Sequence, residues 1–414
     1  MKILLLTFLL STMQLSAQLS GCTDPLATNY NALAVLNDGS CTYANVTIVP
    51  DSGIVLPGVM SETSGLVLFN DQLLTHNDDS DTNLYLVDPS DPDDYTTLPI
   101  TGASNIDWED IAEDENYIYI GDFGNNVSGN RTNLRIFRIL KSELMNNPVA
   151  DTISFSYETQ TDFIPQSSNS TDFDCEAFIV TAGKIHLFTK EWGTKKTSVY
   201  ELEKTPGTHV AIYKGTLNVQ GLITGATHLE EEQLIVLSGY SIVMQPFVYL
   251  LYDFENDDFF SGNKRKIMLN LPYHQVEGIT SADGLTYYLS NEAFATGNIQ
   301  VDPKITTIDL SFYLSNYLEG NPLAVKEVVA NTFVQVFPNL AKEAVVIQLS
   351  EEQIGIITSV ELIDGTGRTV LKQGINGQQI TILLKETGTE NGILFAVFRN
   401  GQNEVLSTAR LLVK

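Results

Sequence analysis

A weak internal repeat is the feature of this sequence that most constrains its fold. Each copy pairs a strand that begins with small or acidic residues with a more apolar strand that ends in polar residues. The five copies align on Gly65, Asp110, Ala177, Gly225 and Gly278, at intervals of 45, 67, 48 and 53 residues. This spacing fits one four-stranded blade per copy, with an insertion in the second. The repeat therefore predicts an all-β chain with a β-propeller over residues 45–325, in which five blades are favoured and six are the alternative.

The last of these blades is incomplete in the sequence. Its third strand falls at Lys304 to Leu310, and no obvious fourth strand follows. An open ring would leave strand edges unpaired. We therefore expect Val46 to Val49, which precede the first blade, to supply the missing strand and close the ring.

The first residues have the pattern of an export signal. Lys2 supplies a positive start, Ile3 to Leu10 form an apolar run, and Leu15-Ser16-Ala17 is typical of a cleavage site. Residues 1–17 are therefore predicted to be a signal peptide. The apolar run is shorter than the ~20 residues that span a bilayer, and no later segment is long and apolar enough either. We expect no transmembrane anchor in the mature chain.

A short module rich in Asp and Asn is predicted at residues 21–43. Cys22 and Cys41 bracket 18 residues that have almost no apolar periodicity. A segment that cannot bury a core needs a covalent link, and an oxidising compartment permits a disulfide between these two cysteines. Oxygen-bearing side chains in the module would suit Ca²⁺, although their spacing is not that of an EF-hand and solvated turns are the alternative. These candidate ligands are Asp24, Asn29, Asn31 and Asp38.

The charge of the chain is strongly negative and unevenly distributed. Residues 331–414 carry 7 basic and 8 acidic residues and residues 1–44 carry one basic and two acidic, so the net charge of -28 leaves -26 for residues 45–330. Binding to nucleic acid depends on Lys and Arg that neutralise phosphates, so we expect no nucleic-acid partner. Cations, neutral glycans or basic proteins suit this surface better.

The acidic residues fall at equivalent positions of the repeat. Glu109, Glu176 and Glu277 share one position of the first strand, and Asp107 and Asp174 lie two residues earlier in two of the copies. The first strand of each blade lines the channel of a propeller, so these carboxylates should converge there. A cation, a proton or a basic partner must then compensate their repulsion.

A second ring of polar residues is predicted from the ends of the following strands. The full set of candidate ligand-binding or metal-binding residues at the channel is His76, Asp78, Asp107, Glu109, Asp110, Asp122, Asn125, Asp174, Glu176, Lys190, Glu277 and Glu292. Because the candidate ligands are mostly oxygen atoms, Ca²⁺ is the expected metal. Strand-end residues that cap neighbouring backbone amides are the structural alternative, and no residue can be assigned a catalytic role.

The propeller segment resembles secreted phytase-like and esterase-like propellers. The resemblance rests on Thr75-His76-Asn77-Asp78, Asp107-Trp108-Glu109-Asp110-Ile111-Ala112, Gly121-Asp122-Phe123-Gly124-Asn125-Asn126, Glu176-Ala177 and Glu277-Gly278. It implies a propeller with an acidic central face and leaves activity open, because propellers carry both enzymes and scaffolds. Lys190 and Arg131 are the only basic residues near these motifs, which argues against phosphate binding and phytase activity.

The last segment, residues 331–414, reads as a separate β-sandwich of seven short strands divided by glycines. Val336-Phe337-Pro338-Asn339 and Leu411-Leu412-Val413-Lys414 resemble the start and end of the C-terminal sorting domain of the Bacteroidetes type IX secretion system. Leu340 replaces a usual proline. The resemblance implies the type IX secretion machinery as a partner and a secreted or outer-membrane cell-surface location. The stretch from Gly21 to Cys41 resembles a short module of secreted Bacteroidetes proteins and implies the same location.

These observations lead to two expectations about function. The first is a secreted or cell-surface propeller that binds a ligand, a glycan, small molecule or protein, at an acidic channel that holds Ca²⁺. The alternative is a secreted hydrolase, phytase-like or esterase-like, that acts on a phosphate ester, a carboxyl ester or a glycan at the channel mouth.

Overall fold

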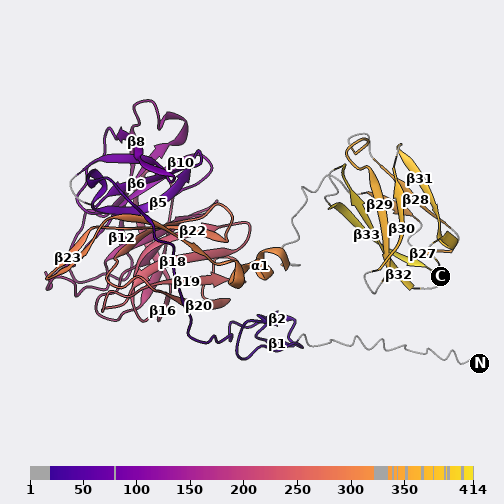
Figure 1. Cartoon of the computed structure of the whole chain (residues 1–414), viewed down its shortest axis with the longest axis horizontal. Helices are drawn as coiled ribbons and strands as arrows, with labels where there is room; N and C mark the ends of the chain where they lie inside the picture. Colours follow the sequence, from indigo (N-terminus) through magenta and orange to yellow (C-terminus); the bar gives the residue numbers. More distant parts are fainter. Residues whose placement is uncertain are drawn as a thin grey trace, which may run out of the picture. The chain divides into compact units, whose positions relative to one another are not determined.

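The computed structural model describes residues 19–78, 81–320 and, with short gaps, 334–413. The predicted signal peptide, residues 1–17, lies outside the described residues. The chain divides into two compact units, residues 1–320 and 321–414, and nearly all of its regular structure is β (Figure 1). The helix α1 (Ser311–Gly320) ends the first unit. No helix among the described residues is long and apolar enough to cross a membrane.

The described part of the first unit is a propeller of five blades, in which blades 2 and 3 join in one eight-stranded sheet and blade 4 gains a fifth strand. Blade 1 comprises β5 (Thr63–Phe69), β6 (Gln72–Asn77), β7 (Asn83–Asp88) and β8 (Asp91–Pro99). Blade 2 comprises β9 (Trp108–Glu113), β10 (Tyr117–Asp122), β11 (Arg135–Leu140) and β12 (Ala150–Tyr157). Blade 3 comprises β13 (Cys175–Val180), β14 (Ile185–Thr189), β15 (Thr197–Leu202) and β16 (Gly207–Leu217). The propeller predicted from the repeat is therefore confirmed.

The remaining blades use strands from both ends of the unit. Blade 4 comprises β17 (Leu222–Leu229), β18 (Leu234–Tyr240), β19 (Pro246–Tyr252) and β20 (Asn263–Leu269). Blade 5 comprises β21 (Val276–Thr280), β22 (Thr286–Asn291), β25 (Lys304–Asp309) and β4 (Ile54–Val55). The short hairpin of β23 (Phe294–Thr296) and β24 (Ile299–Val301) lies between β22 and β25.

The strand that closes the ring is not the one that we expected. β4 pairs with β25 and completes blade 5, whereas Val46 to Val49 contribute β3 (Thr47–Ile48), which adds in parallel to the outer edge of blade 4. Asp51 fixes this arrangement, because its carboxylate accepts hydrogen bonds from the Thr307 backbone N–H at 2.9 Å and the Thr307 hydroxyl at 2.7 Å. The expectation about Val46 to Val49 is therefore wrong, since the anchor at Asp51 places the following residues against the last blade.

Apolar side chains between neighbouring blades form the core. Five clusters of buried residues occupy the five blade interfaces of the described propeller. Trp108 is fully buried between blades 1 and 2, with its ring 5.6 Å from His76 and 6.1 Å from Phe137. Blades 2 and 3 are also joined at their outer edges by parallel pairing of β12 with β16. This packing holds the inner strands of all blades around one axis.

The N-terminal module contacts the outer edge of blade 4. The disulfide between Cys22 and Cys41 is confirmed, and the module also contains β1 (Ser20–Gly21) and β2 (Leu36–Asn37). The Asp24 carboxylate accepts hydrogen bonds from the hydroxyls of Tyr43 and Tyr252 at 2.8 and 2.5 Å. These contacts connect the module to the blade that also receives β3.

The second unit is a β-sandwich, as the sequence predicts. One sheet contains β26 (Gln335–Phe337), β28 (Ala344–Gln348) and β31 (Gln379–Leu383). The other contains β27 (Leu340–Ala341), β33 (Val405–Val413), β32 (Gly392–Arg399), β29 (Ser359–Asp364) and β30 (Thr369–Gly374). A buried apolar cluster that includes Val345, Val360 and Phe398 lies between the sheets.

Replacing Asp24 with Ala should weaken the attachment of the module. Both tyrosine hydroxyls lose a charged acceptor, so we expect the free energy of unfolding to fall by about 1–3 kcal/mol. Thermal unfolding and limited proteolysis of residues 19–44 measure the effect. The matched control is Asp38→Ala, because the exposed Asp38 carboxylate accepts the N–H of its near neighbour Ser40 within the module. Equal stability and protease resistance of the two variants would contradict this account of docking.

Candidate functional site

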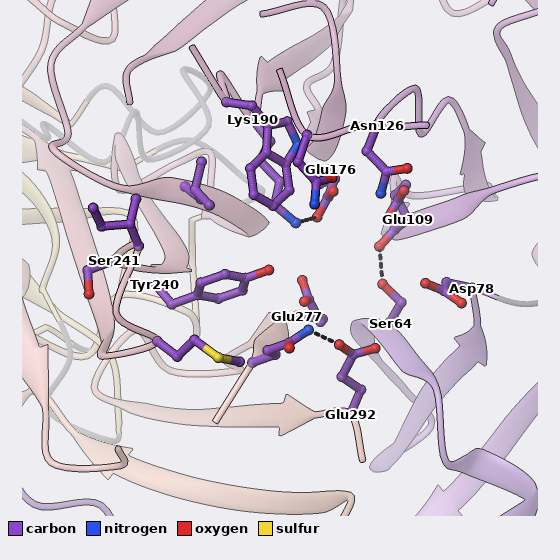
Figure 2. A pocket seen from close by; sticks show the side chains of 16 residues that line it. Ser64, Asp78, Glu109, Asn126, Glu176, Lys190, Tyr240, Ser241, Glu277 and Glu292 are labelled. Carbon is purple, nitrogen blue, oxygen red and sulfur yellow. Dashed lines mark hydrogen bonds and ion pairs between the residues drawn. The ribbon is translucent and has the colours of Figure 1, made fainter. Parts of the chain in front are cut away.

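A polar cavity of about 370 Å³ opens where the inner strands of the five blades begin (Figure 2). The first strand of each blade runs away from this end and the second strand returns to it, so strand starts and strand ends meet at the cavity. All five blades contribute to its wall. The lining residues are Ser64, Asp78, Glu109, Asn126, Asn169, Glu176, Lys190, Trp192, Leu222, Tyr240, Ser241, Ile242, Met244, Gln275, Glu277 and Glu292.

Three carboxylates cluster in the deep part of the cavity region. Glu109, Asp174 and Glu176 are buried, and one oxygen atom from each lies within 4.8 Å of the others. Asp174 accepts the Asn125 backbone N–H at 2.6 Å and the Trp192 Nε1–H at 2.7 Å. Its two oxygens are therefore held by donors of the protein itself.

The Lys190 ammonium compensates part of this charge. It is 4% exposed and donates a hydrogen bond to the Glu176 carboxylate (Figure 2). Its nitrogen also lies 4.9 Å from the centre of the Trp192 ring and 5.2 Å from that of Tyr240, within the range of cation–π contacts. The deep cluster thus already contains a cation supplied by the chain.

A second group of carboxylates lies at the mouth. Oxygen atoms of Glu62, Asp78 and Glu292 lie within 4.8 Å of one another, and all three residues are half-buried. Gln275 donates a hydrogen bond to the Glu292 carboxylate. Glu277 lines the same cavity at 6% exposure, and its Oε2 atom has no hydrogen-bond partner among the described residues. The Lys190 ammonium forms its ion pair with Glu176 of the deep cluster, and its charge also acts on Glu277 and Glu292.

Burial and mutual repulsion raise the pKa of four carboxyl groups that line the cavity, Glu109, Glu176, Glu277 and Glu292. Burial raises the pKa of Glu109 and Glu176 well above the usual carboxyl value, and the Lys190 ammonium opposes the rise at Glu176. Burial raises the pKa of Glu277 to about 7, and burial followed by repulsion from Glu277 raises that of Glu292 to about 9. Burial alone would lower the pKa of Lys190, but Glu176 and other neighbours raise it instead. The ammonium therefore stays charged.

Several residues proposed for the channel instead hold the backbone together. Asp110 accepts the N–H groups of Ile111 at 2.9 Å and Phe178 at 3.0 Å, which links blade 2 to blade 3. His76 is fully buried with its Nδ1 atom 3.1 Å from the Asn77 carbonyl, and burial lowers its pKa to about 4. These two side chains are absent from the described cavity lining.

Asp122 and Asn125 likewise point away from the cavity. The Asp122 carboxylate accepts hydrogen bonds from Arg131 and Arg135, both at 2.8 Å. The Asn125 side chain accepts the Arg131 N–H at 2.9 Å and donates to the Phe173 carbonyl at 3.1 Å. Sequence position alone could not reveal these partners, because they come from a loop and from the next blade.

Asp107 lies beside the deep cluster and faces an arginine. Its carboxylate lies 3.9 Å from the Arg131 guanidinium. Burial, reinforced by the Asp174 charge, raises its pKa to about 6. It belongs to the electrostatic surroundings of the cavity without lining it.

The candidate metal ligands of the N-terminal module serve local structure. Asp24 accepts the two tyrosine hydroxyls described above, and Asn29 accepts the Thr42 N–H at 2.8 Å. Asn31 and Asp38 each accept the N–H two residues further on, at 3.1 and 3.0 Å. These contacts correspond to the turn interpretation, and a metal site in this module stays a prediction.

Sequence reasoning missed several residues of the site, among them Glu62, Trp192, Tyr240 and Gln275. Glu62 was detectable, because it stands two residues before Ser64 as Asp107 stands before Glu109. Trp192, Tyr240 and Gln275 lie in loops or at strand ends outside the aligned motifs, and no periodic signal marks them.

Comparison with known proteins identifies the second unit. Residues 335–414 match the sequence profile of the secretion system C-terminal sorting domain. This segment is the sorting domain of type IX secretion, so the chain is a secreted or cell-surface protein. A search of the curated proteins found no match.

Solved structures resemble the chain only distantly. PorZ, a surface component of the type IX secretion system of Porphyromonas gingivalis, is 11% identical with a TM-score of 0.30, over 85% of this chain and 45% of PorZ. A glutaminyl cyclase of Myxococcus xanthus is 13% identical with a TM-score of 0.37, over 64% of this chain and 100% of that one. An exo-β-1,3-galactanase of Phanerochaete chrysosporium is 8% identical with a TM-score of 0.40, over 86% and 98% of the two chains. The chain thus spans less than half the length of PorZ.

The raised pKa of Glu277 predicts that the stability difference between the wild type and Glu277→Gln depends on pH. In the unfolded chain this carboxyl ionises near its usual pKa of 4.5, whereas in the folded protein it holds its proton until about pH 7. The folded state therefore binds more protons between these values, and its stability falls as pH rises. In EDTA, raising the pH from about 5 to about 8 should destabilise the wild type by on the order of 2–3 kcal/mol relative to Glu277→Gln.

Denaturant unfolding at several pH values measures this difference. The control is Glu143→Gln, because Glu143 is exposed and does not line the cavity. A difference between wild type and Glu277→Gln that stays constant with pH would contradict the assignment.

Proposed function

We propose that the protein is a secreted or cell-surface binding module that holds a divalent cation, Ca²⁺, at the mouth of its acidic cavity. The observation that carries this proposal is Glu277, whose buried Oε2 atom has no described partner although it faces a cavity lined by other carboxylates. An ionised carboxylate in such a place is costly unless a cation or a proton compensates it.

The position of Lys190 favours the mouth over the deep cluster. A divalent ion bound by Glu109, Asp174 and Glu176 would lie close to the Lys190 ammonium, and the two cations would repel each other. Both oxygens of Asp174 also accept N–H donors already. At the mouth, Glu62, Asp78 and Glu292 offer oxygen atoms to an ion, and none of the three is the Glu176 carboxylate that binds the Lys190 ammonium.

The chemistry of the mouth suits Ca²⁺ in particular. Calcium takes six to eight oxygen ligands in a flexible arrangement and accepts water in the remaining places. The half-buried carboxylates can supply the protein ligands while the opening admits water. Because the pKa values of Glu277 and Glu292 are raised, binding of the ion displaces protons from these two groups.

Calcium binding can be measured by titration calorimetry and by terbium luminescence. We expect wild-type affinity near the range of extracellular modules, about 0.1–1 mM, and a higher melting temperature with the ion. Asp78→Asn, Glu277→Gln and Glu292→Gln should each weaken binding by about tenfold, which corresponds to about 1.4 kcal/mol. Asp94→Asn is the control, because Asp94 is exposed on β8. No binding by the wild type, or full affinity in all three mouth variants, would contradict the proposal.

A hydrolase is the second candidate, and one observation favours it. Glu109 and Glu176 are neighbouring buried carboxyls with raised pKa values, so one can keep a proton at neutral pH while the other is ionised. A paired acid and base of this kind is what glycoside hydrolysis and other general acid–base reactions require.

Turnover assays test this candidate directly. Nitrophenyl esters, phosphates and glycosides serve as substrates, with and without Ca²⁺. The hydrolase predicts turnover that Glu109→Gln abolishes while its melting temperature shows that the variant still folds. Absence of turnover on the whole panel by folded, calcium-loaded protein excludes the hydrolase for these substrate classes.

A further inference from the structure

We infer that the cavity behind the calcium mouth binds a neutral carbohydrate rather than a charged ligand. The inference deepens the proposed function by naming the class of ligand, and it rests on the cavity as the binding site.

The charges in the deep cavity disfavour ligands of either sign. An anionic ligand would meet Glu109, Glu176 and Glu277, all of which line the cavity. A cationic ligand would meet the Lys190 ammonium, which already occupies the place between Glu176, Trp192 and Tyr240. A neutral polar ligand avoids both repulsions.

The lining also provides both donors and acceptors of hydrogen bonds. Asn126, Asn169 and Gln275 line the cavity together with the carboxyl groups. An amide side chain donates through its NH₂ group and accepts through its oxygen. Sugar hydroxyls both donate and accept, so they match this mixture better than an ammonium, which only donates.

Two aromatic rings and the size of the cavity agree with a sugar ring. Trp192 and Tyr240 form part of the wall, and Figure 2 shows the Tyr240 hydroxyl pointing into the cavity between Lys190 and Glu277. The Trp192 Nε1–H is already donated to Asp174, so Trp192 offers apolar ring surface to a sugar, whereas Tyr240 offers its hydroxyl as well. The volume of about 370 Å³ lies within the range of small-ligand pockets, about 300–1,000 Å³.

A ligand series that changes only the charge tests the inference on the wild-type protein. Neutral hexoses, pentoses and N-acetylhexosamines, and oligosaccharides built from them, are screened by titration calorimetry in Ca²⁺. The binder is then compared with its uronic acid and with its free amino sugar. We expect a neutral binder with a Kd below about 1 mM, at least about tenfold weaker binding of the uronic acid, and no gain for the amino sugar.

A variant in the wall checks that binding occurs in this cavity. Asn126→Ala removes one amide and should weaken saccharide binding about fivefold to tenfold, while calcium affinity stays within about twofold. The matched control is Asn146→Ala, because Asn146 is exposed in the turn after β11 and does not line the cavity.

The outcomes separate this inference from the proposed function. If the amino sugar or the uronic acid binds more tightly than the neutral saccharide, the assignment of a neutral ligand is overturned. Calcium binding without any saccharide binding overturns the inference and leaves the calcium site standing. Saccharide binding that Asn126→Ala does not change also overturns it, because the ligand would then bind elsewhere. If the protein binds neither calcium nor a saccharide, both the proposed calcium site and the carbohydrate inference are overturned.

Discussion

The ion pair between Lys190 and Glu176 is the interaction on which the rest of the site depends. The propeller directs the inner strands of five blades toward one axis, so carboxylates at equivalent repeat positions must share a poorly solvated cavity. Without compensation their repulsion would oppose folding. Lys190 supplies one positive charge, held between Trp192 and Tyr240. This charge compensates part of the negative charge of the deep cluster. The Glu62, Asp78 and Glu292 carboxylates form a second cluster at the mouth, beside the Glu277 Oε2 atom that has no hydrogen-bond partner among the described residues, which is why we propose a calcium site there and a neutral ligand behind it.

Much of the fold could be predicted from the sequence, because the repeat and the strand patterns are local signals. The first three strands of every blade and seven strands of the sandwich fall where strand patterning places them. The closing strand could not be predicted in the same way. Ile54–Val55 is a two-residue strand with both side chains exposed, and its position depends on hydrogen bonds between Asp51 and Thr307, which lie far apart in the sequence.

The site was predictable for those residues whose position in the repeat determines which way the side chain points. Glu109, Glu176 and Glu277 share one position on the inner strands, and all three line the cavity. Strand-end residues behave differently, because each can turn toward the cavity or toward a backbone donor. Asp122, at the end of β10, binds arginines, whereas Asp78 and Glu292, which follow β6 and β22, line the cavity. Only the three-dimensional course of the loops decides between these directions, and the same loops bring in Trp192 and Tyr240.

The central claim is that the carboxylates at the mouth, rather than those of the deep cluster, hold the cation. The most direct test is a crystal structure of the protein soaked with Ca²⁺ or Tb³⁺, with the ion located by its anomalous scattering. The account predicts one ion bound by Glu62, Asp78 or Glu292 together with Glu277, while Lys190 remains paired with Glu176. An ion among Glu109, Asp174 and Glu176 with Lys190 displaced, or no ion in the cavity at saturating concentration, would contradict it.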